Sequence, residues 1–208
     1  MKFILFFFLS LFCIAGQAQG VFRGSVLLNA YVGFPNIMKL AIPNTEYYAE
    51  YGTISYQGSL PPSGLRFMYM ATDRLSIGFD LIYSTANANV YQSDTSFFNG
   101  QWQITTNNYR IEKKQFRPQF RLDMHHYALD PNLDIYAGLA IGGNFRNKKV
   151  YQNDSLIYTS GNDIMNLLFP ISMRACFGLR YFFDYNFAVG GEVGLGGPIF
   201  QGALTYRF

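Results

Sequence analysis

The chain has little charge and very few cysteines. Asp, Glu, Lys and Arg make up 14% of its 208 residues, against about 25% in typical soluble domains. Its two cysteines are Cys13 and Cys176, and only the second lies outside the N-terminal segment discussed below. A single remaining thiol excludes an internal disulfide. The formal net charge is +3 and there is no basic tract, so we expect no nucleic-acid partner.

The chain also lacks a long apolar run after its first residues. Beyond residue 18, no stretch of about 18 consecutive apolar residues occurs, which excludes a bundle of membrane helices. Aromatic residues nevertheless make up 18% of the chain, while the mean hydropathy is only +0.04. Apolar and polar residues must therefore be interleaved. If the protein lies in a membrane, it crosses that membrane as a barrel of strands.

The first 18 residues are typical of a secretory signal peptide. Lys2 supplies the basic start, an apolar core follows over residues 3–14, and Gly16-Gln17-Ala18 is a small-x-small cleavage site. The apolar core is too short to span a bilayer as a helix, although a retained N-terminal anchor helix is the alternative. We assign residues 1–18 to the signal peptide and residues 19–208 to one exported domain.

Eight segments alternate between apolar and polar residues with period two, which is the side-chain repeat of a β-strand. No apolar position in them carries a charge. Pro118 lacks an amide hydrogen, so it predicts a bulge or a local lapse of pairing in the fourth segment. The segments are 22–34, 65–71, 75–83, 116–124, 133–145, 169–181, 187–195 and 200–208.

The connections between these segments alternate between short turns and long stretches, except that the last connection on the long side, around 196–198, is also short. The short turns lie around 72–74, 130–132 and 184–186, and the long stretches cover about 35–63, 84–110 and 146–167. Turn signals at Asn99-Gly100 and Asn153-Asp154 predict two hairpins that continue past the barrel. Short turns on one end and long connections on the other are typical of outer-membrane barrels. The sequence therefore predicts an all-β, eight-stranded antiparallel up-and-down transmembrane barrel.

Side-chain volume indicates which face points outward. The interior of an eight-stranded barrel is just wide enough for side chains to fill. The apolar positions hold most of the Phe and Leu, whereas the polar positions are rich in Gly, Ala and Ser, so we expect the apolar face to contact lipid. A secreted, soluble lipocalin-like barrel with the opposite orientation is the alternative.

The polar positions then place seven arginines and four carboxylates in the lumen. Arg presents a rigid fork of donors that suits packed ion pairs. Because an unpaired buried charge is strongly destabilising, each carboxylate should contact an arginine. The excess positive charge should be met by water, backbone carbonyls or the barrel mouths. The predicted ion-pair network comprises Arg23, Arg66, Asp80, Arg117, Arg121, Asp123, Asp134, Arg174, Arg180, Glu192 and Arg207.

The signal peptide, the eight segments, the three short turns and the final Tyr206-Arg207-Phe208 together resemble the small eight-stranded outer-membrane β-barrels of OmpA/OmpX type. The resemblance covers the mature chain as a pattern and includes no catalytic motif. It implies an integral location in the outer membrane of a Gram-negative envelope. In that family the barrel-assembly machinery recognises a last strand with alternating aromatics, which here implies Leu204, Tyr206 and Phe208. An ordinary strand end in a soluble sheet is the alternative.

The residues offer no catalytic or metal-binding motif. The sequence contains neither GxSxG nor HExxH, and its two histidines, His125 and His126, are adjacent and should point to opposite faces. We interpret them as part of an interfacial turn, and we expect no enzymatic activity, metal or cofactor.

The long connections carry aromatic side chains suited to contact with a partner. They are Tyr47, Tyr48, Tyr51, Tyr56, Phe97, Phe98 and Trp102. Exposed Tyr and Trp supply contact area in binding loops, although these side chains could instead hold the connections together or rest in lipid headgroups. We predict a non-enzymatic barrel with a filled lumen, whose extracellular loops serve adhesion, envelope architecture or an accessory role in an envelope complex. A narrow porin-like channel and a lipid-modifying enzyme remain alternatives.

Overall fold

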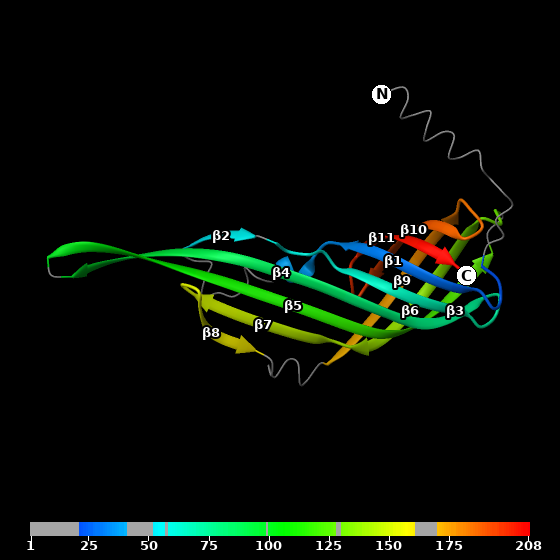
Figure 1. Ribbon diagram of the computed structural model, residues 1–208, viewed down its shortest axis with the longest axis horizontal. Helices are drawn as coiled ribbons and strands as arrows, with labels where there is room; N and C mark the ends of the chain where they lie inside the picture. Colours follow the sequence, from blue (N-terminus) through cyan, green and yellow to red (C-terminus); the bar gives the residue numbers. More distant parts are fainter. Residues whose placement is uncertain (1–20, 41–51, 57, 99, 128–129, 161–169) are drawn as a thin grey trace, which may run out of the picture.

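The chain forms a closed β-barrel from which a narrower sheet extends (Figure 1). The computed structural model describes residues 21–40, 52–56, 58–98, 100–127, 130–160 and 170–208. The predicted signal peptide, residues 1–18, lies outside these ranges. Within them the one helix is a single turn, α2 (Ile37–Leu40). None of the described helical structure is long and apolar enough to cross a membrane.

Eight strands form the barrel in up-and-down order. Each strand pairs antiparallel with the next one in the chain, and β1 pairs with β11 from Leu27↔Arg207 to Phe34↔Phe200, which closes the sheet. The predicted eight-stranded antiparallel barrel is therefore confirmed. The strands are β1 (Val26–Phe34), β3 (Ser63–Met70), β4 (Leu75–Phe98), β5 (Gln101–Tyr127), β6 (Leu133–Gly143), β9 (Ile171–Phe182), β10 (Phe187–Leu195) and β11 (Phe200–Arg207).

Side chains on these strands alternate between an exposed apolar exterior and a buried polar interior. Leu139 on β6 is 64% exposed, whereas Arg121 on the neighbouring β5 is fully buried. The predicted orientation of the two faces is confirmed, because so narrow a barrel has room inside only for small and ion-paired residues. We call the exposed ring the apolar belt; it includes Val32, Leu65, Phe67, Phe79, Leu81, Phe120, Leu122, Leu139, Ile141, Met173, Phe177, Leu179, Val189, Val193 and Leu204.

Strands β4 and β5 continue far beyond the apolar belt as one long hairpin, which forms the arm at the left of Figure 1. Their pairing runs without interruption from Leu75↔Met124 to Phe98↔Gln101. Three further strands widen this arm: β2 (Gly52–Tyr56) pairs with β4, β7 (Phe145–Gln152) pairs with β5, and β8 (Ser155–Ser160) pairs with β7. We call this extension, in the order β2–β4–β5–β7–β8, the protruding sheet.

The protruding sheet has its own tight turns and its own apolar core. Asn153 and Asp154 adopt φ of 48° and 65° between β7 and β8, a geometry typical of two-residue hairpin turns. Gly100, with φ of 77°, lies at the end of the β4–β5 hairpin, so both predicted hairpins are confirmed. The apolar core comprises Ala86, Ala88, Val90, Ile111 and Val150, with Met38, Tyr56 and Tyr109 packed against it. Side-chain packing therefore stabilises the sheet in addition to backbone pairing.

Pro118 lies where the barrel and the protruding sheet separate. Its ladder with β4 is unbroken. On its other side, the β5–β6 pairing ends at Gln119↔Gly142 and the β5–β7 pairing begins at Phe116↔Phe145. The missing amide hydrogen therefore falls in the gap between β6 and β7, which confirms the predicted lapse of pairing.

Candidate functional site: the barrel lumen and its outer mouth

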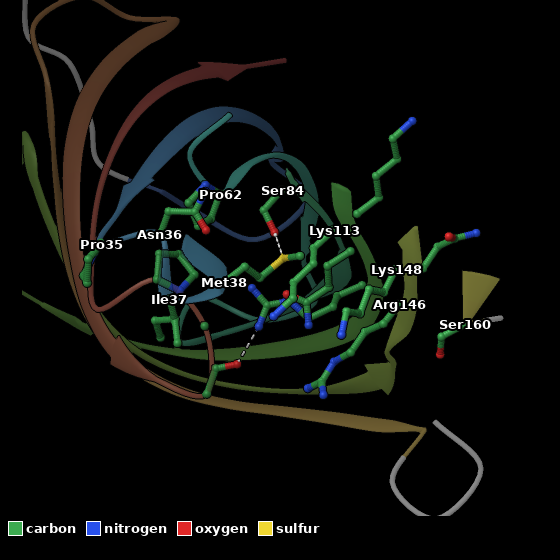
Figure 2. A pocket seen from close by; sticks show the side chains of 17 residues that line it. Pro35, Asn36, Ile37, Met38, Pro62, Ser84, Lys113, Arg146, Lys148 and Ser160 are labelled. Atoms are coloured by element: carbon green, nitrogen blue, oxygen red, sulfur yellow. Dashed lines mark hydrogen bonds between the residues drawn. The ribbon is translucent and has the colours of Figure 1, made fainter. Parts of the chain in front are cut away.

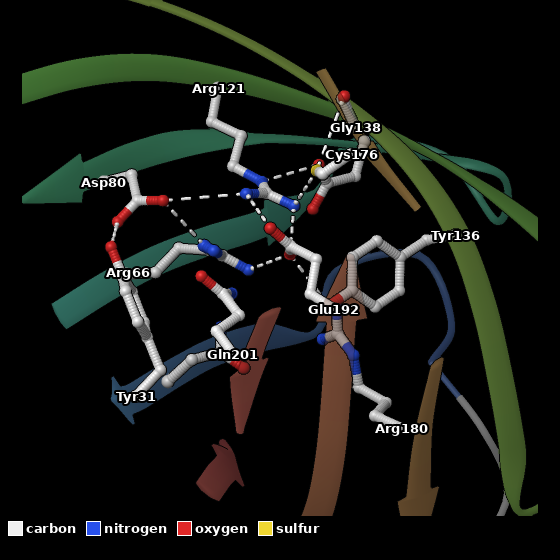
Figure 3. Close-up of polar contacts among 12 residues, drawn as sticks. Tyr31, Arg66, Asp80, Arg121, Tyr136, Gly138, Cys176, Arg180, Glu192 and Gln201 are labelled. Atoms are coloured by element: carbon white, nitrogen blue, oxygen red, sulfur yellow. Dashed lines mark hydrogen bonds and ion pairs between the residues drawn. The ribbon is translucent and has the colours of Figure 1, made fainter. Parts of the chain in front are cut away.

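Charged side chains gather in two places, a pocket at one mouth of the barrel (Figure 2) and the lumen below it (Figure 3). We call the end that carries the protruding sheet the outer end, and the end with the short turns the inner end. The lumen is described first, because its packing decides whether the barrel can conduct.

An ion-pair network centred on Glu192 fills the middle of the lumen (Figure 3). Glu192, on β10, accepts hydrogen bonds from Arg66 of β3 at 2.9 Å, from Arg121 of β5 at 2.7 Å and from Arg174 of β9 at 2.8 Å. None of these four side chains is more than 1% exposed. Arg121 also lies 3.0 Å from the sulfur of Cys176. The Glu192 carboxylate therefore links four strands, β3, β5, β9 and β10.

The other three carboxylates of the lumen also contact arginine. The pairs are Arg66–Asp80 at 3.1 Å, Arg121–Asp123 at 2.7 Å and Arg180–Asp134 at 3.0 Å. Together with the Glu192 contacts they comprise four arginines and four carboxylates, so their formal charges cancel. Such balance is what a buried set of ions requires, because a buried charge without a partner is strongly destabilising.

Two tyrosines that the sequence analysis did not single out complete the network. Tyr31 donates a hydrogen bond to Asp80, and Tyr136 donates one to Glu192 at 3.2 Å. Both tyrosines occupy polar positions of the alternation, which is the signal that could have identified them. The ring of Tyr136 fills the space above Gly178, its direct partner on the neighbouring strand, so an aromatic side chain occupies the room that the glycine leaves.

Two further arginines lie at the ends of the lumen and bind backbone carbonyls. Arg117 donates to the carbonyl of Gly196 at 3.0 Å near the outer end. Arg207 donates to the carbonyl of Tyr185 at the inner end, where its guanidinium also lies 4.5 Å from the centre of the Tyr185 ring. The positive charge in excess of the balanced set is thus placed at the two mouths.

Arg23 does not lie in the lumen, and this part of the sequence prediction is corrected. The first strand begins at Val26, and Arg23 is exposed in the turn before it. Gly24 adopts φ of 89°, a left-handed conformation that glycine tolerates and that interrupts the period-two alternation. The backbone amide of Arg23 donates to the carboxylate of Asp73 at 2.9 Å. Strand parity cannot be extended through such a turn.

The interpretation of the histidine pair as an interfacial turn is also corrected. His125 belongs to β5, and its ring is buried between Asp134 at 2.7 Å and Ser76 at 2.9 Å. His126 is exposed on the opposite face, as strand alternation requires. Among the described residues, no group of His, Cys, Asp and Glu side chains could hold a metal ion.

An apolar cluster lies at the inner end of the lumen, next to the guanidinium of Arg207. Leu27, Met68, Phe182 and Ala188 pack together there, and none is more than 1% exposed. Buried apolar side chains and buried ion-paired side chains therefore both occupy the bore.

The predicted contact aromatics have different positions. Tyr47, Tyr48 and Tyr51 lie outside the described residues, and Phe98 ends β4, opposite Gln101. Tyr56 packs against the apolar core of the protruding sheet and beneath the ammonium of Lys39, so it holds the sheet together. Phe97 and Trp102 are 61% and 72% exposed at the hairpin tip, with ring centres 5.1 Å apart.

The three residues of the predicted assembly signal share the outward face of β11. Leu204 and Phe208 are exposed, and Tyr206 is half-buried. Tyr206 packs edge-on against Phe208 and Phe187, with ring centres 4.7 and 4.9 Å apart. The backbone amide of Phe208 donates to the carbonyl of Val26 at 2.9 Å, which fixes the end of the chain to the first strand.

No family model matches this chain, and no curated protein matches its sequence. Among solved structures, it is similar to Ail, the attachment invasion locus protein of Yersinia pestis, with a TM-score of 0.43 and 10% identity over 89% of this chain and 99% of that one. Ail in complex with the heparin analogue sucrose octasulfate gives a TM-score of 0.42 and 12% identity, again over 89% and 99% of the two chains.

A second similar protein is the outer membrane protein OprG from Pseudomonas aeruginosa, with a TM-score of 0.41 and 13% identity over 92% of this chain and 99% of that one. Because these scores and identities are low, the fold of this chain is established by its own strand pairing.

Proposed function

We propose that this protein is a non-enzymatic, integral outer-membrane β-barrel that does not conduct and that holds the protruding sheet outside the cell for contact with a partner protein. The apolar belt supports the membrane location, since a ring of exposed Leu, Ile, Phe and Val around all eight strands far exceeds the apolar patches that soluble proteins expose. A closed barrel leaves no unpaired strand edge in lipid, as a spanning sheet requires.

The filled lumen supports an anchoring role over the alternative of a narrow channel. The Glu192 network and the apolar cluster around Phe182 both fill the lumen with buried side chains, so ions would have to displace them. A purified sample in a planar lipid bilayer should show no single-channel steps. Regular steps would favour the channel instead.

The observation that carries the proposal is the outer edge of β8. Within the described part of the chain, β8 pairs on one side only, with β7. It bears no charge, and Leu156 and Ile157 are 54% and 50% exposed along it. Natural sheets normally protect an edge with charge, proline or a bulge, because unpaired backbone groups recruit another strand. An extended, uncharged segment of a partner protein can add to such an edge through main-chain hydrogen bonds.

A photo-crosslinking amino acid at Ile157 tests this contact in intact cells. We expect one discrete adduct, and the same probe at Asn147, on β7 and nearer the barrel, should give none. Mass spectrometry would identify the partner, and the purified partner should protect the β8 amides from hydrogen exchange. The charged variant Ile157→Lys should abolish that protection. Protection confined to the hairpin tip around Trp102 would refute the β8 edge as the contact.

A further inference from the structure

The far end of the protruding sheet carries an exposed apolar patch at the tip of the β4–β5 hairpin. Phe97 and Trp102 are direct partners across the two strands, and Thr95↔Ile104 is the next pair on the same face. Phe97, Trp102 and Ile104 are 61%, 72% and 72% exposed, and we call these three side chains the tip patch. Single exposed apolar residues need no explanation, whereas a group of them on one face marks a contact site.

The chain around the tip patch carries no charge. Residues 95–109 contain no Asp, Glu, Lys or Arg, so the tip has no charged group that would select an acidic or a basic partner. Trp and other aromatic residues beside uncharged polar groups are typical of the membrane–water interface, where the ring lies among acyl chains and its polar edge stays among headgroups. The composition of the tip therefore favours a lipid surface.

The small size of the tip patch also favours lipid over a partner protein. Between residues 93 and 107 the two strands of the hairpin pair only with each other in the described part of the chain, so the tip is a two-stranded ribbon. Three side chains of this kind bury at most about 500 Å², whereas a stable protein interface buries about 800 Å² on each partner. A bilayer needs no such matched surface, because each apolar side chain enters it separately.

The tip patch is too far from the apolar belt to contact the bilayer that holds the barrel. Phe97 follows Leu81, a residue of the belt, by 16 positions on the same strand, which corresponds to roughly 50 Å of extended chain. A strand tilt of about 45° still leaves about 35 Å between the belt and the tip. Figure 1 shows the hairpin pointing away from the barrel along the long axis of the molecule. The lipid surface must therefore belong to a second membrane.

We propose that the tip patch inserts into the headgroup region of a second, facing bilayer of zwitterionic lipid. The insertion is shallow, because a two-stranded ribbon has unpaired backbone groups along its edges, and these groups need water or headgroups as hydrogen-bond partners. The hairpin thus attaches the cell surface to another membrane through apolar contacts. This inference goes beyond the proposed contact at β8 and does not depend on it.

The chain contains its own probe for this contact, because Trp102 is its only tryptophan. The full-length protein is placed in phosphatidylcholine nanodiscs, and phosphatidylcholine vesicles with bromine-labelled acyl chains are added. We expect the Trp102 emission to shift to shorter wavelength and to be quenched as vesicles are titrated. In nanodiscs made of the brominated lipid, without vesicles, the emission should be unchanged. Quenching there would show that the tip rests on its own membrane and would overturn the proposal.

Two lysine variants at neighbouring positions separate the tip patch from the rest of the ribbon. Ile104→Lys removes an apolar side chain of the patch and should weaken vesicle binding at least about tenfold. The matched control is Thr105→Lys, which adds the same charge to an exposed position on the opposite face and should change binding less than about twofold. If Ile104→Lys disrupts the hairpin, Ile104→Thr keeps the β-branched shape and should still weaken binding measurably.

Four results would contradict insertion of the tip patch. They are an emission that vesicles do not change, equal losses in Ile104→Lys and Thr105→Lys, loss of binding when salt is raised to about 1 M to screen charges, and a shift of the emission with protein concentration alone. The last result would assign the patch to a second copy of this chain. Because the vesicles contain no protein, none of these outcomes bears on the β8 contact.

Discussion

One glutamate accepts hydrogen bonds from three buried arginines, so its charge should matter more to stability than any surface ion pair. Glu192 accepts from Arg66, Arg121 and Arg174. Glu192→Gln would leave these guanidiniums with an uncompensated positive charge in the lumen, and removing one partner of a buried pair costs about 3–5 kcal/mol. We expect the free energy of unfolding to fall by that amount, measured from urea titrations in which the folded fraction is read from the mobility of unheated gel samples.

A matched control for this prediction lies on the protruding sheet. Glu112 pairs with Arg110 at 3.5 Å, and both side chains are partly exposed. Exposed pairs contribute about 0–1 kcal/mol, so Glu112→Gln should hardly move the unfolding midpoint. Similar losses in the two variants would mean that the Glu192 network contributes no more than a surface contact.

At the scale of single residues, strand parity predicts which side chains enter the lumen, but it does not predict which of them meet there. Parity is a local property, and it is enough to place Asp80 or Arg174 inside the barrel. It fails for Arg23, because Gly24 interrupts the alternation with its positive φ. It also cannot show that Arg66 and Arg121 converge on Glu192, since their meeting depends on the stagger between strands that are far apart in the sequence.

At the scale of elements, the apolar belt makes each strand sensitive to charge on its outer face. Leu139 lies on the outward face of β6 and is 64% exposed. An outward-facing Arg near the bilayer midplane destabilises a membrane barrel by about 2–4 kcal/mol, so Leu139→Arg should lower the stability of the folded barrel in lipid vesicles by that amount, measured by the same urea titration.

The control for the belt is a substitution to the same residue beyond it. Thr106 is exposed on β5 opposite Ser93, where the strand has left the belt, and Thr106→Arg should change stability by less than about 1 kcal/mol, as exposed polar positions do. A neutral Leu139→Arg variant would show that this face does not contact lipid.

The same belt explains which elements the sequence could reveal. Where one face meets the apolar exterior and the other meets the lumen, alternation is strict, and the predicted segments coincide closely with the barrel strands. Beyond the belt this contrast fades, so the continuation of β4 to Phe98 and of β5 from Gln101 was predicted only as a hairpin within a long connection. Strand β2 is five residues long and shows no alternation strong enough to identify it.

Across the whole molecule, charge is arranged in layers along the barrel axis. The inner end combines the apolar cluster around Phe182 with the guanidinium of Arg207, the middle holds equal numbers of arginines and carboxylates around Glu192, and every charged residue described in the lining of the outer pocket is basic. Balanced charge suits a region that only has to be filled.

Closure of the whole barrel depends on its last strand, because β11 pairs with both β10 and β1. Phe208 directly follows this strand; its amide donates to the carbonyl of Val26 and its ring packs on Tyr206. We propose that the outward face of Leu204, Tyr206 and Phe208 is read during assembly. Deleting Phe208 removes both the ring and the last backbone bond, so the amount of assembled barrel in outer-membrane fractions should fall.

The amount of assembled barrel is measured as the band that changes its gel mobility on heating. Phe183→Ala removes an exposed aromatic ring from the same end of the barrel but outside β11, and it should assemble at the wild-type level. Phe208→Tyr keeps the aromatic ring and the backbone bond and should assemble normally as well. If the deletion assembles as well as these two variants and resists protease equally, closure needs only the strand pairing, and the terminal aromatic has no part in recognition.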